Sequence, residues 1–148
     1  MENNISIFND NRGTFIPYNL EGWDQMNISI NEAKYTFRGL HYQTKPYQTK
    51  LVKVIQGKVL DFLYNIKSGV VEVYELDQSN DLLVTDNYAH GFLTLEPDTI
   101  FTYLVKGKYN PKSEHSIIWN TIPEVKAIIE SYTTADKLTI SEKDKLGK

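Results

Sequence analysis

Short hydrophobic runs, bounded by turn-forming residues, follow one another through the middle of the chain. The clearest alternation of apolar and polar residues lies at 70–76, as expected for a strand with one buried face. The other runs are rich in β-branched and aromatic residues, which favour strands. The pattern predicts strands at 51–55, 59–64, 70–76, 82–85, 90–95 and 99–106, with turns at 56–58, 68–69 and 78–81.

The spacing of these runs indicates how the strands are arranged. Only Gln56-Gly57-Lys58 separates 51–55 from 59–64, so we expect these two strands to form a hairpin. Short strands at near-regular spacing predict an antiparallel sandwich or barrel. The chain has no internal repeat and no low-complexity linker, so residues 1–148 are expected to form one domain.

The last part of the chain changes character. Residues 122–130 have Pro123 near their start and apolar residues at helical spacing, which predicts a short helix or turn. Ser141 followed by Glu142 is typical of an N-cap with an acidic first turn, which predicts a helical segment near 140–144. This segment would fray unless something anchors it. The expected fold class is therefore all-β with short terminal helical segments.

Composition and charge exclude several classes of protein. Of the 148 residues, 41% are hydrophobic and 24% charged, which is ordinary for a soluble domain, and no apolar run approaches the roughly 18 residues of a membrane span. Residues 1–4 lack the features of a signal peptide, and the absence of Cys excludes disulfides, so we expect a cytoplasmic protein without a membrane partner. The net charge of -3 argues against a nucleic-acid partner, but not against a small anion held in a cleft.

The two arginines point to such an anion. The chain has 16 Lys and Arg residues, and only Arg12 and Arg38 are Arg. A guanidinium grips phosphate or carboxylate oxygens with two parallel hydrogen bonds, which the ammonium of Lys cannot do. Gly follows each arginine directly, and this allows close approach of the backbone to a ligand. Both positions are therefore candidate anion-binding residues.

Two histidines and two tyrosines are the other candidates for chemistry. His41 lies three residues after Arg38, and on a strand it would share a face with Gln43, which suits recognition of a polar ligand; the alternative is a hydrogen-bonded structural histidine. His90 precedes a glycine, and its alternative is an exposed residue at a strand end. Tyr103 and Tyr109 are either packing residues or, inside a cleft, proton donors.

Metal binding is not expected. The histidines are His41, His90 and His115, and no His-x-His pair with a downstream Glu occurs, as metal-binding barrels of this kind usually have. The chain also lacks a phosphate-binding Gly-rich loop and a nucleophile elbow.

Several motifs, in order along almost the whole chain, resemble the dTDP-4-dehydrorhamnose 3,5-epimerase family of nucleotide-sugar enzymes. The most specific are Arg38-Gly39-Leu40-His41 and Ala89-His90-Gly91-Phe92. The full set of matches covers 8–15, 25–29, 38–43, 48–52, 89–92, 109–111 and 140–144, together with Tyr103 and Glu114.

The resemblance implies a cupin-type jelly roll that uses no metal or other cofactor, usually a homodimer, and acts on a nucleoside-diphosphate 4-keto-6-deoxy sugar. It implies that His41 removes a proton next to the 4-ketone, that Asp144 pairs with His41, that Lys50 faces the enolate oxygen, and that Tyr103 returns a proton to the opposite face. A carboxylate beside an imidazole fixes its tautomer, which agrees with this assignment. The resemblance also implies substrate-binding roles, partly in the partner subunit's cavity, for Arg12, Gln25, Asn27, Arg38, His90, Tyr109, Glu114 and Lys143.

The sequence departs from the family at a few positions and leaves two alternatives open. Pro17 stands where the family has an acidic residue, Asn65-Ile66-Lys67 replaces Asp-Ile-Arg, and the loop that follows is reduced to Ser68-Gly69. The alternatives to an epimerase are a nucleotide-sugar 3,4-ketoisomerase and a non-catalytic sugar-binding cupin.

Overall fold

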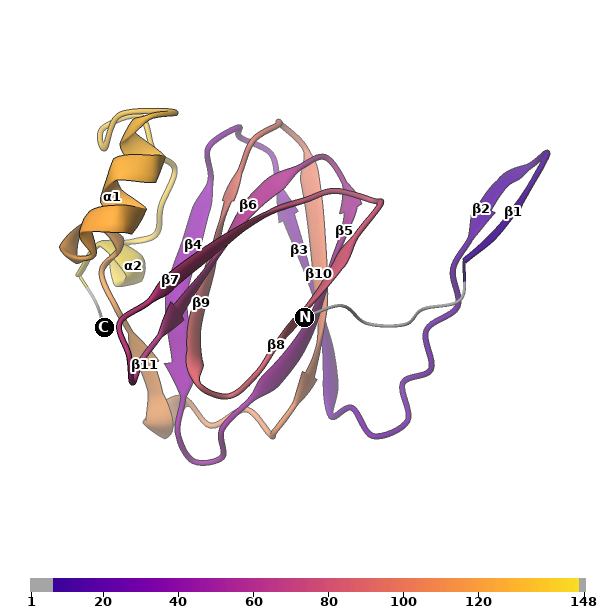
Figure 1. The fold of residues 1–148 in the computed structure, drawn as a ribbon, viewed down its shortest axis with the longest axis horizontal. Helices are drawn as coiled ribbons and strands as arrows, with labels where there is room; N and C mark the ends of the chain where they lie inside the picture. Colours follow the sequence, from indigo (N-terminus) through magenta and orange to yellow (C-terminus); the bar gives the residue numbers. More distant parts are fainter. Residues whose placement is uncertain (1–6, 147–148) are drawn as a thin grey trace.

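A computed structural model describes residues 7–146 and shows two facing β-sheets with helices on one side and an extended arm on the other (Figure 1). The expected domain covers 1–148, and the expectation about a signal peptide concerns residues 1–4. Both extend outside the described residues and remain predictions. The elements, in chain order, are β1 (Phe8–Asp10), β2 (Gly13–Phe15), β3 (Gln25–Asn31), β4 (Phe37–Gln43), β5 (Thr49–Gln56), β6 (Val59–Asn65), β7 (Val71–Leu76), β8 (Asp81–Val84), β9 (Tyr88–Thr94), β10 (Thr99–Lys106), a 3₁₀ turn (Pro111–Ser113), β11 (Glu114–Ser116), a second 3₁₀ turn (Trp119–Thr121), α1 (Pro123–Glu130) and α2 (Glu142–Leu146). None of the helices within 7–146 has the length and apolar character needed to cross a membrane.

The two sheets form a jelly roll. One has four strands in the order β3-β10-β5-β8, and the other has five in the order β11-β4-β9-β6-β7; all pairs are antiparallel. Many neighbours in a sheet are distant in sequence, because the chain crosses repeatedly from one sheet to the other. This architecture confirms the all-β, cupin-type fold class.

The strands expected from the hydrophobic pattern are present as β5 to β10, but one expected pairing is wrong. β5 and β6 do not form a hairpin: β5 pairs with β8 and β10, whereas β6 pairs with β7 and β9. The turn through Gly57, whose φ is +88°, carries the chain from one sheet to the other. A tight turn can either return a strand along its neighbour or pass it to the facing sheet, and the local sequence does not distinguish the two.

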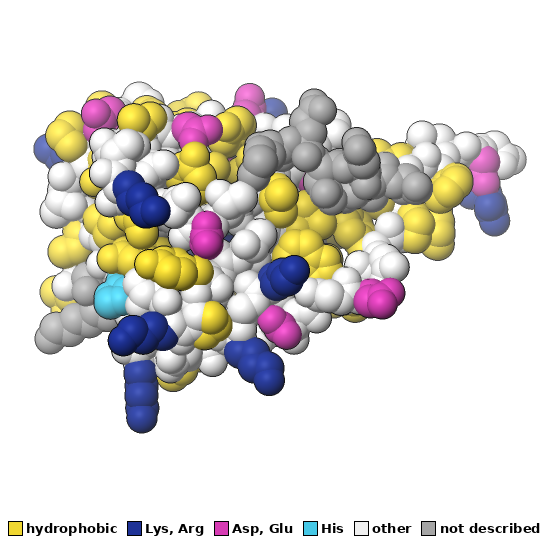
Figure 2. Space-filling view, turned by 60° about the horizontal axis from the view of Figure 1, so that its bottom comes forward, with side chains coloured by type: hydrophobic (Ala, Val, Ile, Leu, Met, Phe, Trp, Pro, Cys, Tyr) yellow, Lys and Arg dark blue, Asp and Glu magenta, His cyan; other side chains and the backbone are white. Residues whose placement is uncertain are grey.

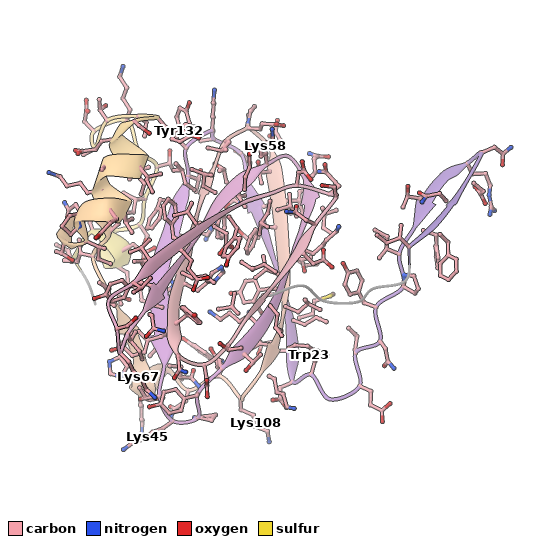
Figure 3. The ribbon with its side chains drawn as sticks, in the orientation of Figure 1. Trp23, Lys45, Lys58, Lys67, Lys108 and Tyr132 are labelled. Carbon is pink, nitrogen blue, oxygen red and sulfur yellow. The ribbon has the colours of Figure 1, made fainter. Side chains whose placement is uncertain are left out.

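The five-stranded sheet is buried on both faces. Inside the barrel, Phe92 stacks on Phe101 of the facing sheet, with ring centroids 4.0 Å apart. On the outer face, Phe37 and Phe62 pack with Trp119 and with α1. Burial on both faces explains why β6 and β9 have nearly continuous hydrophobic sequences. The stick view shows side chains filling the space between the sheets (Figure 3).

The other residues of 7–146 leave the outer face of the four-stranded sheet largely uncovered. Met26, Ile28 and Ile30 of β3 are 52%, 59% and 66% exposed, and Ile55 of β5 is 50% exposed. Met26, Ile28 and Ile55 line one apolar groove on this face. Apolar patches of this kind mark interaction surfaces on soluble proteins. Figure 2 shows hydrophobic side chains gathered where the arm leaves the barrel.

The N-terminal arm, residues 7–24, leads from the β1–β2 hairpin to β3, and the hairpin projects away from the barrel (Figure 1). Its root is fixed to the barrel: the hydroxyl of Tyr18 donates to Asp81 Oδ2 at 3.2 Å, and Lys53 Nζ lies 3.2 Å from Asp81 Oδ1. Trp23 lies at the junction of arm and barrel (Figure 3), and the next residue, Asp24, donates its N–H to Val105 O at 2.8 Å.

Both expected helical segments are present. α1 begins at Pro123 and buries Val125 and Ile129 against the five-stranded sheet. α2 begins after Ser141, whose Oγ accepts the N–H of Asp144 at 3.2 Å, as an N-cap does. The anchor that α2 requires is Asp144 itself, which is buried against β4.

Candidate active site

The barrel opens into a cleft with two connected lobes. The larger lobe has a volume of about 450 Å³ and the smaller about 230 Å³. His41, Lys50, Tyr103 and Asn27 line both lobes and so mark their junction. Every predicted site residue except Arg12 lines the cleft: the larger lobe adds Arg38, His90, Lys143 and Asp144, and the smaller adds Gln25, Tyr109 and Glu114.

His41 and Asp144 form a close imidazole–carboxylate pair. His41 lies on β4 and Asp144 on α2, and His41 Nε2 is 2.6 Å from Asp144 Oδ1. The second oxygen, Oδ2, accepts the backbone N–H of Gly39 at 3.1 Å. Because both carboxylate oxygens are engaged, Asp144 is fixed and holds the imidazole with its other ring nitrogen available to the cleft.

The electrostatics of Asp144 favour its charged form. Burial alone would raise the pKa of Asp144. This effect is outweighed by the hydrogen bond and the charge of His41, by the Gly39 N–H and by the charge of Lys143, so the pKa lies below its ordinary value. Asp144 is therefore an anion at neutral pH and can stabilise the imidazolium that forms when His41 takes up a proton.

A pair of glycines brings a second histidine opposite the first. Gly39 has a φ of +130°, and a Cβ placed on it would lie 2.5 Å from Gly91 Cα, so only glycine allows β4 and β9 to approach this closely. In this register His41 and His90 are direct Cα partners. His90 is 6% exposed, so the alternative interpretation, an exposed residue at a strand end, is wrong.

His90 has its own carboxylate, which the sequence reasoning missed. Its Nε2 lies 2.7 Å from Oδ2 of Asp61, a fully buried residue of β6. Burial raises the pKa of Asp61, although the nearby charges of His90 and Lys50 draw it down. The available signal was a single charged residue in the otherwise apolar run 59–63, since buried charges are rare unless they are paired.

Lys50 and Tyr103 lie on the facing sheet. They belong to the neighbouring strands β5 and β10, and Lys50 Nζ is 5.4 Å from the Tyr103 ring centroid. Burial lowers the pKa of Lys50, whereas the charges of Asp61 and Glu114 raise it. The His41 pair and Tyr103 thus approach the cleft from opposite sheets, with an ammonium beside the tyrosine.

The two arginines have different surroundings. Arg38 lines the larger lobe, and its Nε donates to Asn31 Oδ1 at 2.8 Å. Arg12 lies on the arm, where it forms an exposed ion pair with Asp10, with Arg12 NH2 2.6 Å from Oδ2. The structure therefore brings Arg38, but not Arg12, to the cleft of its own chain.

The remaining predicted binding residues lie near the rim. Lys143 of α2 is paired with Glu114 of β11, and this bond raises the pKa of Lys143. Gln25 Nε2 donates to Asn27 Oδ1 at 2.6 Å, and Tyr109 is exposed beside them. Together these groups give the rim both charges and several hydrogen-bonding groups.

Gln43 lies on the same face of β4 as His41, as expected, but its amide is taken up by loop backbone. Its Nε2 donates to Pro46 O and Lys108 O at 2.8 and 2.9 Å, and its Oε1 accepts the N–H of Asn110 at 2.9 Å. Gln43 therefore joins the two loops below the cleft, which Lys45 and Lys108 mark in Figure 3. Within the described part of the chain, no group of three or more potential metal-ligating side chains was found.

A jelly-roll barrel whose cleft holds an imidazole–carboxylate pair opposite a phenol defines a cupin-type acid–base enzyme. Comparison with known proteins gives its family. A family model described as dTDP-4-dehydrorhamnose 3,5-epimerase matches residues 2–148. The chain belongs to the dTDP-4-dehydrorhamnose 3,5-epimerase family, which consists of isomerases.

Individual relatives agree with this assignment. A protein of that name from Pseudomonas aeruginosa is 29% identical over 159 residues, which cover 96% of this chain and 86% of the relative. One from Neisseria gonorrhoeae is 32% identical over 130 residues, which cover 77% of this chain but only 40% of the relative.

Two solved structures carry informative ligands. The Bacillus anthracis enzyme, with TDP and PPi bound, is 30% identical with a TM-score of 0.79, over 97% of this chain and 90% of that one. The Legionella pneumophila enzyme, in complex with dTDP-4-keto-L-rhamnose, is 28% identical with a TM-score of 0.80, over 97% of this chain and 83% of that one.

Proposed function

We propose that this protein epimerises a dTDP-linked 4-keto-6-deoxy sugar at C3 and C5 through an enolate. The observation that carries the proposal is the placement of the His41–Asp144 pair and Tyr103 on facing sheets of one cleft. Inversion at carbon requires removal of a proton from one face and its return to the other, and a base and an acid on opposite walls meet that requirement.

The proposed steps use this chain's own groups. The ring nitrogen of His41 that is not bonded to Asp144 takes the proton from C3, and the C–H electron pair forms the C3–C4 double bond as the carbonyl becomes an enolate. The Lys50 ammonium stabilises the negative oxygen. Tyr103 then protonates C3 from the opposite face and the carbonyl re-forms. The imidazolium releases its proton and the phenolate regains one from solvent, so the same cycle can act at C5.

The binding residues suit a nucleoside diphosphate. Arg38 and Lys143 supply positive charge at the larger lobe, and His90 lines its wall. Gln25, Asn27, Tyr109 and Glu114 supply hydrogen-bonding groups at the smaller lobe. The TDP and dTDP-4-keto-L-rhamnose bound to the two related enzymes support this class of substrate.

We also propose that the protein acts as a homodimer. The apolar outer face of the four-stranded sheet is available to a second copy, and the arm carries the exposed Phe8 and Phe15 together with Arg12 away from its own cleft. A dimer that buries this face would bring Arg12 toward the partner's cleft. Sedimentation velocity tests this: the wild type is expected to be dimeric and Ile28→Asp to dissociate, and a monomeric wild type would contradict the proposal.

The function is tested by incubating dTDP-4-keto-6-deoxyglucose with the protein in deuterated water. Deuterium is expected at C3 and C5 with wild type, and not with His41→Asn, which should retain its fold and its affinity for dTDP. NMR of the product separates epimerisation from movement of the keto group to C3. Ligand binding without exchange would instead indicate a sugar-binding module, and exchange that survives in His41→Asn would show that the base is misassigned.

A further inference from the structure

Asn31 is a buried side chain at the end of β3 that holds the guanidinium of Arg38. Asn31 is 2% exposed, and its Oδ1 accepts Arg38 Nε at 2.8 Å across the junction between the two sheets. Its Oδ1 also accepts the hydroxyl of Ser29 at 3.1 Å, and its Nδ2 donates to Thr99 O at 3.1 Å. The amide is therefore fixed on both ends, and so is the one nitrogen of Arg38 that it engages.

The terminal nitrogens of Arg38 are left for another group. Among residues 7–146, neither of them has a hydrogen bond to protein and no carboxylate forms an ion pair with Arg38. Arg12 differs in both respects, since Asp10 engages its Nε and NH2 and neutralises its charge. A neutral amide on Nε orients a guanidinium without compensating its charge, so Arg38 presents a charged pair of donors to the larger lobe.

We propose that Asn31 is a positioning residue that sets Arg38 to receive the diphosphate of the nucleotide-sugar substrate. This inference rests on the proposed function and adds a residue to it. An unrestrained Arg side chain loses rotamer freedom on binding, and Asn31 removes part of that loss in advance. The effect should therefore appear only with ligands that carry phosphate, because Asn31 itself is buried beneath Arg38.

Calorimetric titration with dTDP, inorganic pyrophosphate and thymidine tests the proposal. Asn31→Ala is expected to weaken the binding of dTDP and of pyrophosphate by about three- to tenfold, which corresponds to the cost of ordering one long side chain. The affinity for thymidine should not change. Asn31→Asp keeps an acceptor for Nε but adds a negative charge, so it should weaken both phosphate ligands at least as much. In an Arg38→Ala background, Asn31→Ala should change dTDP affinity by less than about twofold, because the two residues act as one unit.

A matched control separates positioning from loosening of the sheet. Thr102→Val removes the bond from Thr102 Oγ1 to Asn27 O, at 2.8 Å another tie between β3 and β10, without touching Arg38, so its dTDP affinity should equal that of wild type. If Asn31→Ala fails to fold, Asn31→Leu supplies the comparison, because it keeps the side-chain size and removes the acceptor for Arg38 Nε.

The outcomes distinguish this inference from the function on which it rests. Wild type that binds dTDP with the same affinity as the Asn31 variants would overturn the role of Asn31 alone. An Asn31 effect that extends to thymidine, or that persists without Arg38, would do the same. Wild type that binds neither dTDP nor pyrophosphate would overturn the proposed function and this inference with it.

Discussion

Replacing Asp144 by Asn changes the proposed catalytic pair without changing the size of the side chain. In the native pair, one carboxylate oxygen accepts from His41 and the other accepts the N–H of Gly39. The backbone N–H requires an acceptor, so the amide oxygen of Asn must face Gly39 and its NH₂ must face His41. The NH₂ then donates to Nε2, and the ring proton moves to the nitrogen that should receive hydrogen from the substrate. Asp144→Asn therefore holds His41 in a tautomer that cannot act as the base.

The size of the effect follows from two losses. A hydrogen bond to a charged group contributes roughly 1.5–3 kcal/mol, and each 1.4 kcal/mol is about tenfold in rate, so loss of the counter-charge alone lowers kcat by about 10- to 100-fold. The tautomer must also be corrected before each turnover, and we expect a total decrease in kcat of about 10²–10⁴-fold. KM should change by less than about threefold, because the buried Asp144 contacts His41 and backbone.

The measurement is steady-state turnover of dTDP-4-keto-6-deoxyglucose, with solvent deuterium incorporation as a second readout. Glu142→Gln is the matched control: it removes a carboxylate from the same helix, but its side chain is 81% exposed, and it should turn over like wild type. Asp144→Asn activity within about threefold of wild type, from folded protein, would refute the assignment of the pair.

Three further outcomes are expected. Burial lowers the pKa of Lys50 below its ordinary 10.5, and the charge of Asp61 opposes this shift. The alkaline fall in kcat should therefore begin below pH 10.5, and it should move to still lower pH in Asp61→Asn. A pH–rate profile that moves upward or stays in place in this variant would contradict the role of Lys50. The pKa of Asp144 is depressed in the folded state, so the contribution of Asp144 to stability is fully present above pH 3.8, its ordinary pKa, and is lost as the pH falls below that value. The urea midpoint of unfolding should therefore decline more steeply below pH 3.8 in wild type than in Asp144→Asn. Parallel curves for the two proteins would contradict this prediction. Gly39→Ala should destabilise by roughly 3 kcal/mol or more in thermal unfolding, whereas Gly13→Ala, with a φ of +127° but nothing within 4 Å of its Cβ, should cost only about 1 kcal/mol; equal losses would exclude the clash with Gly91 as the cause.

The hydrophobic pattern located six of the core strands but not β4, although Phe37 and Leu40 of that strand are buried in the core. β5 to β10 have apolar residues at strand spacing, and α1 and α2 have recognisable first turns. β3 was not assigned, because its inward positions are the polar Asn27, Ser29 and Asn31 that line or support the cleft, and its outward positions are apolar although uncovered. A functional wall thus reverses the usual pattern of burial.

The candidate site was predictable only where a motif carried it. Eleven of the twelve expected residues were found along one cleft, because ordered motifs preserve positions that strand pairing then brings together. Asp61 and Asn31 were missed, because neither stands in such a motif and each acts through a partner on another strand. Asp61 engages His90, 29 residues away, and Asn31 engages Arg38, which is near in sequence but lies on β4 of the facing sheet. Local sequence does not specify register between strands, and the failed pairing of β5 with β6 has the same origin.

The distance along the chain between His41 and Asp144, 103 residues, has a consequence for how activity arises during synthesis. β3 pairs with β10 and β4 pairs with β9, so neither sheet can form completely while the later strand of each pair is still within the ribosome. Such non-local pairing makes folding slow. α2 follows all of these strands in the chain, so a chain with both sheets closed still lacks the carboxylate partner of His41 until α2 packs against β4.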